Sequence, residues 1–191
     1  MSTQVHSFVK LVVIALGALG LAAMAACSTA PKSVEDRAEL RRDAAITLSL
    51  AQRSDPSLTP LVRQSLGYAV FPTIGKGAIA LGGAYGKGVL YDAGKAVGYC
   101  DLTQASIGLQ LGGQSYSEII FFKTAYALSD FKRGDFTFDA QTSAVAIHSG
   151  TGANARYSRG VAVFTMDETG LMYEASIGGQ KFSYEPDSGR P

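Results

Sequence analysis

From residue 67 onward the chain is a succession of short apolar segments interrupted by glycine, and this pattern restricts it to a fold built on a β-sheet. The clearest segment is residues 106–112, where Ile107, Leu109 and Leu111 alternate with glycine and glutamine. Alternation with a period of two places every second side chain on the same face of a strand. We therefore expect a strand here with one apolar face and one face of small or polar residues.

Other segments of the same kind predict that the sheet has many strands. Residues 119–122 are a continuous apolar run, which indicates a strand covered on both faces. Glycine is abundant, with 22 residues in the chain, and favours bulges, bends and close backbone approach, so we expect a strongly curved sheet. The remaining strands are expected at residues 68–72, 77–81, 88–91, 96–101, 136–138, 144–148, 160–166, 171–177 and 182–184.

Two helices are predicted before the strands. The first has Ser33 as its N-terminal cap, at capping-box spacing from Asp36, and ends before Pro56. The second has Thr59 as its cap and Pro60 at the first helical position, where the missing N–H of proline costs nothing. Both helices therefore have start signals that are independent of their apolar pattern.

A third helix is predicted within the strand region, at residues 124–133. Ala125, Leu128 and Phe131 have the spacing of an inward face, and Gly134 is expected to cap the C-terminal end. Helices first, followed by many strands with one inserted helix, is typical of an α+β fold. We predict a glycine-rich, mostly antiparallel and strongly curved sheet with N-terminal helices and one inserted helix.

The N-terminal region has the features of a secretion signal. Residues 11–26 are apolar or small, follow Lys10 and precede Cys27. The run is too short and too rich in glycine and alanine for a comfortable membrane span, and it predicts a signal peptide. Residues 24–27 (MAAC) resemble a bacterial lipobox, in which the peptidase cuts before the cysteine and the cysteine thiol is acylated. The alternative is an ordinary secretory peptide that leaves Cys27 as a plain thiol.

This interpretation divides the chain into four parts. Residues 1–26 are a signal peptide, residues 27–33 an acylated tether, residues 34–185 one domain and residues 186–191 a tail. Acyl chains contribute about 0.8 kcal/mol per buried CH₂, so two or three of them form a durable anchor. Ser28 follows the cysteine, and by resemblance to lipoproteins without aspartate there we expect a lipid-anchored protein at the periplasmic face of the outer membrane.

The net charge of the chain after cleavage argues against nucleic acid as a partner. The predicted signal peptide contains Lys10 but no acidic residue, so 16 basic and 16 acidic residues remain after cleavage and the net charge is zero. Such a chain has no overall field to attract nucleic acid. Cys100 is the only other cysteine besides Cys27, and its apolar neighbours predict a small buried side chain.

No set of residues predicts an enzyme, a metal site or a cofactor. Residues 83–88 contain glycines and Lys87, but they lack both the first glycine of a P-loop and the serine or threonine after its lysine. His148 is the only histidine after the signal peptide, which is too few for most zinc or copper sites. A hydrolase that uses His148 as its catalytic base is a further alternative, although no other residue pattern supports it.

Basic residues near the predicted anchor are the candidate lipid-binding residues. They are Lys32, Arg37, Arg41 and Arg42. Each basic residue near an anionic bilayer contributes about 1 kcal/mol to binding. The same segment contains Glu35, Asp36, Glu39 and Asp43, so the alternative is a solvated helix face with neighbouring charge pairs.

The chain resembles the SYLF-domain family in the order and spacing of four segments. These are residues 66–72 (LGYAVFP) with 82–90 (GGAYGKGVL), residues 108–114 (GLQLGGQ) with 118–122 (EIIFF), residues 136–146 with the following loop 150–153 (GTGA), and residues 170–178. Together they cover roughly residues 58–184. The family includes eukaryotic adaptors that bind phosphoinositides and associate with actin patches, and many bacterial lipoproteins.

The resemblance implies a compact α+β domain that binds lipid and has no known catalytic activity. In eukaryotic relatives an N-terminal amphipathic helix and basic residues contact phosphoinositides, and Lys32, Arg37, Arg41 and Arg42 occupy the corresponding positions here. Bacterial envelopes usually lack polyphosphoinositides, so we expect an anionic phospholipid or an acyl chain as the ligand. The alternative is a structural module of the envelope that binds a protein or peptidoglycan partner, with the anchor serving only for localisation.

Overall fold

The fold is known from a computed structural model that describes residues 29–77, 83–105, 114–138, 143–147, 150–167, 174–176 and 179–188. The helices are α2 (Val34–Ser54), α3 (Leu58–Gln64) and α4 (Ala125–Arg133), with a short 3-10 turn, η1 (Gly152–Asn154). The strands are β1 (Gly67–Gly77), β2 (Gly83–Asp92), β3 (Lys95–Ala105), β4 (Gln114–Phe122), β5 (Ser143–Ala146), β6 (Val161–Asp167), β7 (Glu174–Ser176) and β8 (Gln180–Pro186). None of the helices in these ranges is both long and apolar enough to cross a bilayer.

The strands form one sheet in the order β7-β5-β6-β4-β1-β2-β3-β8, and the sheet is strongly curved. All neighbours are antiparallel except β5 and β6. Three strands separate β4 from β8, yet Nε2 of Gln180 on β8 lies 3.1 Å from Oε2 of Glu118 on β4. The sheet therefore curls around its inner face, and the predicted α+β fold with a curved, mostly antiparallel sheet is confirmed.

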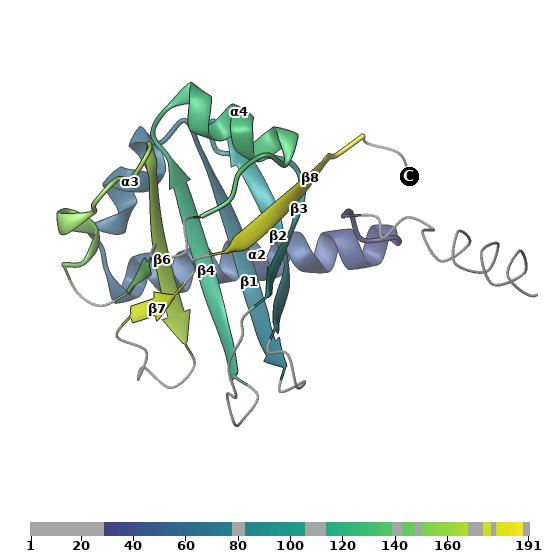
Figure 1. The fold of residues 1–191 in the computed structure, drawn as a ribbon, viewed down its shortest axis with the longest axis horizontal. Helices are drawn as coiled ribbons and strands as arrows, with labels where there is room; N and C mark the ends of the chain where they lie inside the picture. The colour runs from purple at the N-terminus through teal and green to yellow at the C-terminus, as the bar shows by residue number, and fades with distance from the viewer. Residues whose placement is uncertain are drawn as a thin grey trace, which may run out of the picture.

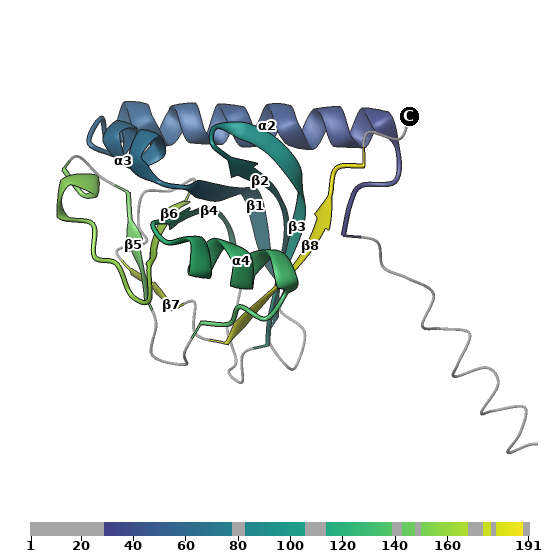
Figure 2. The ribbon, with the colours of Figure 1, turned by 90° about the horizontal axis from the view of Figure 1, so that it is seen from above.

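The helices cover opposite faces of the sheet. Figures 1 and 2 show α2 lying across the outer face and α4 on the inner side of the curve. The inner face packs Phe71, Ile120 and Phe122 against Phe131 of α4, whereas the outer face packs apolar side chains of the sheet against α2. The predicted two-sided burial of residues 119–122 is confirmed, because alternate side chains of this run enter the two clusters.

Helix α2 has the ends that the sequence predicts. The Ser33 side chain accepts a hydrogen bond from the backbone N–H of Asp36 at 2.9 Å, and the helix ends at Ser54. Ala44, Thr47 and Ala51 are its buried residues, and their small side chains allow close approach to the sheet. This contact fixes which side of α2 faces solvent.

Helix α3 starts two residues earlier than predicted. The helix begins at Leu58, so the predicted cap, Thr59, lies within it, and Ser57 occupies the cap position. The reason is the preceding turn, in which the backbone N–H of Leu58 donates to the carbonyl of Asp55 at 3.0 Å and the Asp55 side chain accepts from Ser57. These hydrogen bonds to Asp55 set the start of the helix at Leu58, two residues before Pro60.

Helix α4 is confirmed with one error in its inward face. Thr124 caps the first turn and Gly134, at φ 75°, caps the last. Leu128 and Phe131 are buried as predicted, but Ala125 is exposed and Ala127 is buried in its place. The buried side follows from the approach of α4 to β8 and β4, which a single repeat of apolar residues does not specify.

Residues 29–31, which lie in the predicted acylated tether, are packed against the sheet. Thr29 and Ala30 are 8% and 3% exposed, and Pro31 is buried. The backbone N–H of Ala30 donates to Oε2 of Glu185 on β8 at 3.0 Å. At the other end, Asp187 in the expected tail forms an ion pair with Arg41 of α2.

Several predictions fall wholly or partly outside the described residues. They concern the signal peptide, Cys27, residues 78–81, the strand at 106–112, and His148. The predicted strand at residues 136–138 is reduced to an isolated bridge between Thr137 and Lys181, and the strand at 171–177 to β7 in the described part. The other predicted strands are present, most of them longer than expected.

Candidate functional site

On the α2 side of the sheet, side chains of β2, β3 and β8 lie in cross-strand rows. In an antiparallel sheet, paired residues point to the same face, and the next row on that face is two residues along each strand. The register gives three successive rows: Val89–Tyr99–Glu185, Lys87–Asp101–Ser183 and Tyr85–Thr103–Lys181. Helix α2 and the segment before it pass over the first two rows.

Arg37 and Arg41, two of the four predicted lipid-binding residues, contact the first row. Their guanidinium carbons lie 5.8 and 5.4 Å from the centre of the Tyr99 ring, within cation–π distance. Nε of Arg37 donates to the carbonyl of Pro31 at 2.8 Å, and Arg41 pairs with Asp187. Burial raises the pKa of Tyr99 although these guanidiniums oppose the shift. Both arginines therefore hold α2 against the sheet.

Lys32 and Arg42, the other two predicted residues, are exposed and do not join this cluster. Glu35, Asp36 and Glu39 are exposed on the same helix. The structure thus separates the four basic residues into a packed pair and an exposed pair. The sequence does not make this distinction, since it depends on Tyr99 of β3 and on Asp187, which follows β8, and both are distant from α2 in the sequence.

Arg41→Ala is expected to lower the free energy of unfolding by about 1 kcal/mol. A partly exposed ion pair contributes about 0.2–1 kcal/mol, and the cation–π contact adds a similar amount. Arg42→Ala is the matched control, because Arg42 is the adjacent, exposed arginine of the same helix. Urea unfolding of both variants measures the difference, and equal stability of the two would contradict a packed role for Arg41.

The second row contains a charge pair that the sequence did not reveal as one. Nζ of Lys87 lies 3.0 Å from Oδ1 of Asp101, which is only 7% exposed, and also donates to the carbonyl of Thr29 at 2.9 Å. Burial lowers the pKa of Lys87, but the interaction with Asp101 outweighs this and the pKa is raised. The only sequence signal was the place of Lys87 between Tyr85 and Val89 on one face of a strand.

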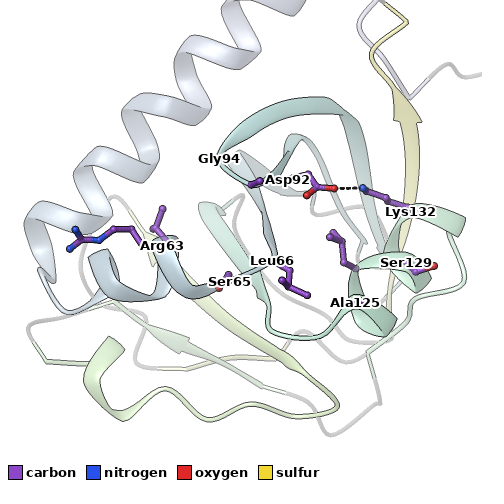
Figure 3. Close-up of a pocket in the computed structure, with 11 residues that line it drawn as sticks. Arg63, Ser65, Leu66, Asp92, Gly94, Ala125, Ser129 and Lys132 are labelled. Atoms are coloured by element: carbon purple, nitrogen blue, oxygen red, sulfur yellow. Dashed lines mark hydrogen bonds and ion pairs between the residues drawn. The ribbon is translucent and has the colours of Figure 1, made fainter.

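A groove lies between α3, the turn joining β2 to β3, and α4. We call it the α3–α4 groove (Figure 3). Its volume is about 860 Å³, within the range of about 300–1,000 Å³ that is typical of ligand pockets. Its lining consists of Val62, Arg63, Ser65, Leu66, Asp92, Ala93, Gly94, Ala125, Leu128, Ser129 and Lys132.

The α3–α4 groove has an apolar centre and charged ends. Leu66 is 46% exposed, a large apolar side chain left open to solvent in the groove. At one end, Nζ of Lys132 pairs with Oδ2 of Asp92 at 2.6 Å. At the other end, Figure 3 shows the exposed Arg63 side chain directed away from that pair. The charged side chains of the lining therefore leave an excess of one positive charge, on Arg63.

A third cluster joins the end of α2 to the loop at residues 150–154. The buried Asp55 carboxylate accepts hydrogen bonds from the backbone N–H groups of Gly150 and Gly152, at 3.0 and 2.6 Å. It also accepts from the backbone N–H and the hydroxyl of Ser57, at 3.0 and 2.6 Å. Burial by itself raises the pKa of Asp55, but these hydrogen bonds outweigh it, so the pKa lies below its ordinary value.

The chemistry of Cys100 is that of a core residue. The thiol is free and fully buried, and burial raises its pKa well above the ordinary value. A thiol of this kind is unreactive because the thiolate is the nucleophile. Within the described ranges, no group of three or more histidine, cysteine, aspartate or glutamate side chains could hold a metal ion.

Parts of the chain are similar in sequence to known proteins. Residues 103–190 match the family model Ysc84, described as Las17-binding protein actin regulator. Beta cell expansion factor A of Aeromonas veronii is 28% identical over 134 residues, which cover 69% of this chain and 51% of that protein. The chain thus spans about half the length of this relative. The family match over residues 103–190, together with this relative, supports the predicted resemblance to the SYLF-domain (Ysc84) family.

Proposed function

We propose that this protein is a lipoprotein of the outer membrane, anchored through acyl chains on Cys27, whose SYLF domain binds lipid without catalysing a reaction. The predicted lipobox and the family match over residues 103–190 support the proposal. The expected ligand is an anionic phospholipid or an acyl chain. Exposed Lys32 and Arg42 remain available to contact lipid head groups, whereas Arg37 and Arg41 are committed to the sheet.

The observation that carries the proposal is the α3–α4 groove. An apolar chain lying over Leu66 and its neighbours would bury both surfaces, at about 0.8 kcal/mol per CH₂ group removed from water. Arg63 has a long, mobile side chain, so an anionic head group at the open end of the groove could pair with it. The groove thus offers both parts of an amphiphile a suitable surface.

The first test is co-sedimentation of residues 28–191, without acyl chains, with neutral and anionic vesicles at low and high salt. Binding to both types at both salt concentrations would indicate an apolar groove, whereas salt-sensitive binding to anionic vesicles would indicate basic residues. We expect Leu66→Asp to weaken binding about fivefold, which corresponds to roughly 1 kcal/mol. Val145→Asp is the control, because Val145 is also exposed, at 42%, but is not among the groove residues.

A module that binds an envelope protein is the second candidate function. Tyr126 is 74% exposed and follows Ala125, a residue that lines the groove. Exposed tyrosine beside an apolar groove is a frequent centre of protein recognition. Absence of vesicle binding together with a specific crosslinked protein in cells would favour this second function over the first.

A further inference from the structure

We infer that the domain is held against the bilayer in one orientation, with the exit row, Tyr85–Thr103–Lys181, facing the lipid. The inference rests on the proposed acyl anchor at Cys27. It concerns a different surface from the α3–α4 groove, and a bilayer rather than a single lipid molecule as the partner.

The chain leaves the domain from a fixed point. Oγ1 of Thr29 lies 3.0 Å from Oγ of Ser183, and the carbonyl of Thr29 accepts from Nζ of Lys87. The next residue, Ala30, donates its N–H to Glu185. Each of these contacts joins the segment to a different side chain of the sheet, so no flexible linker is present from Thr29 onward.

The segment also has a definite direction over the sheet. Going backward from α2, Ala30 contacts the row that contains Glu185, and Thr29 contacts the next row, at Ser183 and Lys87. Figure 2 shows this segment turning back from the start of α2 alongside β8. The row that follows in the same direction is the exit row.

Only Ser28 separates Thr29 from Cys27. Two further residues span at most about 7 Å, which is also the spacing of roughly two residues along a strand from one row to the next. An anchor at Cys27 therefore reaches no farther than the vicinity of the exit row. A bilayer that holds its acyl chains must lie next to this end of the sheet.

The composition of the exit row fits a bilayer surface. Its three side chains are exposed, and Tyr85 is 50% exposed. Tyrosine favours the interface between head groups and acyl chains, and Lys181 supplies a positive charge for anionic head groups. Asp101 in the neighbouring row, which accepts a hydrogen bond from the Tyr85 hydroxyl at 3.4 Å, is buried and paired with Lys87, so it does not oppose this charge.

Tryptophan fluorescence tests the orientation, since the natural chain contains no tryptophan. The full chain, processed in cells and reconstituted into anionic vesicles with brominated acyl chains, would carry one reporter at a time. Thr103→Trp places the reporter in the exit row, and Tyr85→Trp repeats the measurement on β2. Tyr126→Trp on α4 is the control, because Tyr126 is 74% exposed and lies on a different element.

Bromine quenching should be roughly twofold or more stronger at positions 103 and 85 than at position 126, with a blue-shifted emission. Lys181→Glu should reduce this difference in anionic vesicles. Equal quenching at all positions, in protein whose intact mass shows the acylated Cys27, would overturn the orientation and leave the anchor intact. Absence of the acyl mass would overturn both the anchor and the orientation.

Discussion

Asp55→Ala is expected to lower the free energy of unfolding by about 3 kcal/mol, because a buried charged acceptor with several donors is removed. The carboxylate accepts hydrogen bonds from the backbone N–H groups of Gly150 and Gly152 and from the hydroxyl of Ser57. Gly152 is buried, so its N–H would lose its partner without gaining water. The same loss would detach the loop at residues 150–154 from the start of α3.

The contribution of Asp55 is also expected to depend on pH. Its pKa in the folded protein is lower than the ordinary value of 3.8, so folding favours the ionised form. The stabilisation is therefore fully present above the unfolded pKa and is lost as the pH falls through the folded pKa. Urea unfolding of the natural protein and of Asp55→Ala should show a large difference at pH 7, and a smaller one as the pH falls below about 4.

Asp55→Asn is the matched variant for this prediction. One oxygen remains to accept hydrogen bonds, but the amide group of asparagine places a donor opposite a backbone N–H. We expect an intermediate loss of about 1–2 kcal/mol. A stability of Asp55→Ala equal to that of the natural protein at neutral pH would show that the loop is held by other contacts.

Gly98→Ala is expected to cost about 2–3 kcal/mol, since overpacking at a rigid contact forces the backbone to move. A methyl group at this position on β3 would lie 2.6 Å from Cε2 of Tyr184 and 2.9 Å from Cα of Pro186, and it would also meet the carbonyl of Glu185. All three atoms belong to β8, so the strain falls on the β3–β8 pairing.

Gly75→Ala is the control for Gly98→Ala. Gly75 also lies in a strand, but a methyl group there would meet nothing within 4 Å. We expect unchanged or slightly raised stability, because alanine reduces the freedom of the unfolded chain. Thermal and urea unfolding of both variants measure the contrast. Similar losses of stability at the two positions would contradict the interpretation that contact with β8 is what requires glycine at position 98.

The positions of the helices could be predicted because their signals are local. Ser33 caps α2, and Thr124 and Gly134 cap α4, through hydrogen bonds or backbone angles that involve residues only a few positions away. The apolar run at residues 119–122 predicted burial on both faces for the same reason. The curvature of the sheet was expected from its glycines, although the contact between Gln180 and Glu118 was not.

The candidate surfaces could not be predicted, since each is assembled from distant segments. The α3–α4 groove requires α3, the β2–β3 turn and α4 to meet, and no short motif specifies that meeting. The same holds for the fixed position of Thr29, which depends on Lys87 and Ser183. A hydrogen bond between residues far apart in the sequence leaves no periodic trace in either segment.

The sequence by itself determined the signal peptide prediction, the α+β class, the ends of α2 and α4 and the family resemblance, because these depend on composition, periodicity and short motifs. Only the tertiary structure decided that Arg37 and Arg41 pack over Tyr99 while Lys32 and Arg42 remain exposed. Charge and helical spacing are the same kind of signal for all four residues. The two pairs differ because β3, which carries Tyr99, lies beneath the side of α2 that holds Arg37 and Arg41. This contact exists only in the folded chain.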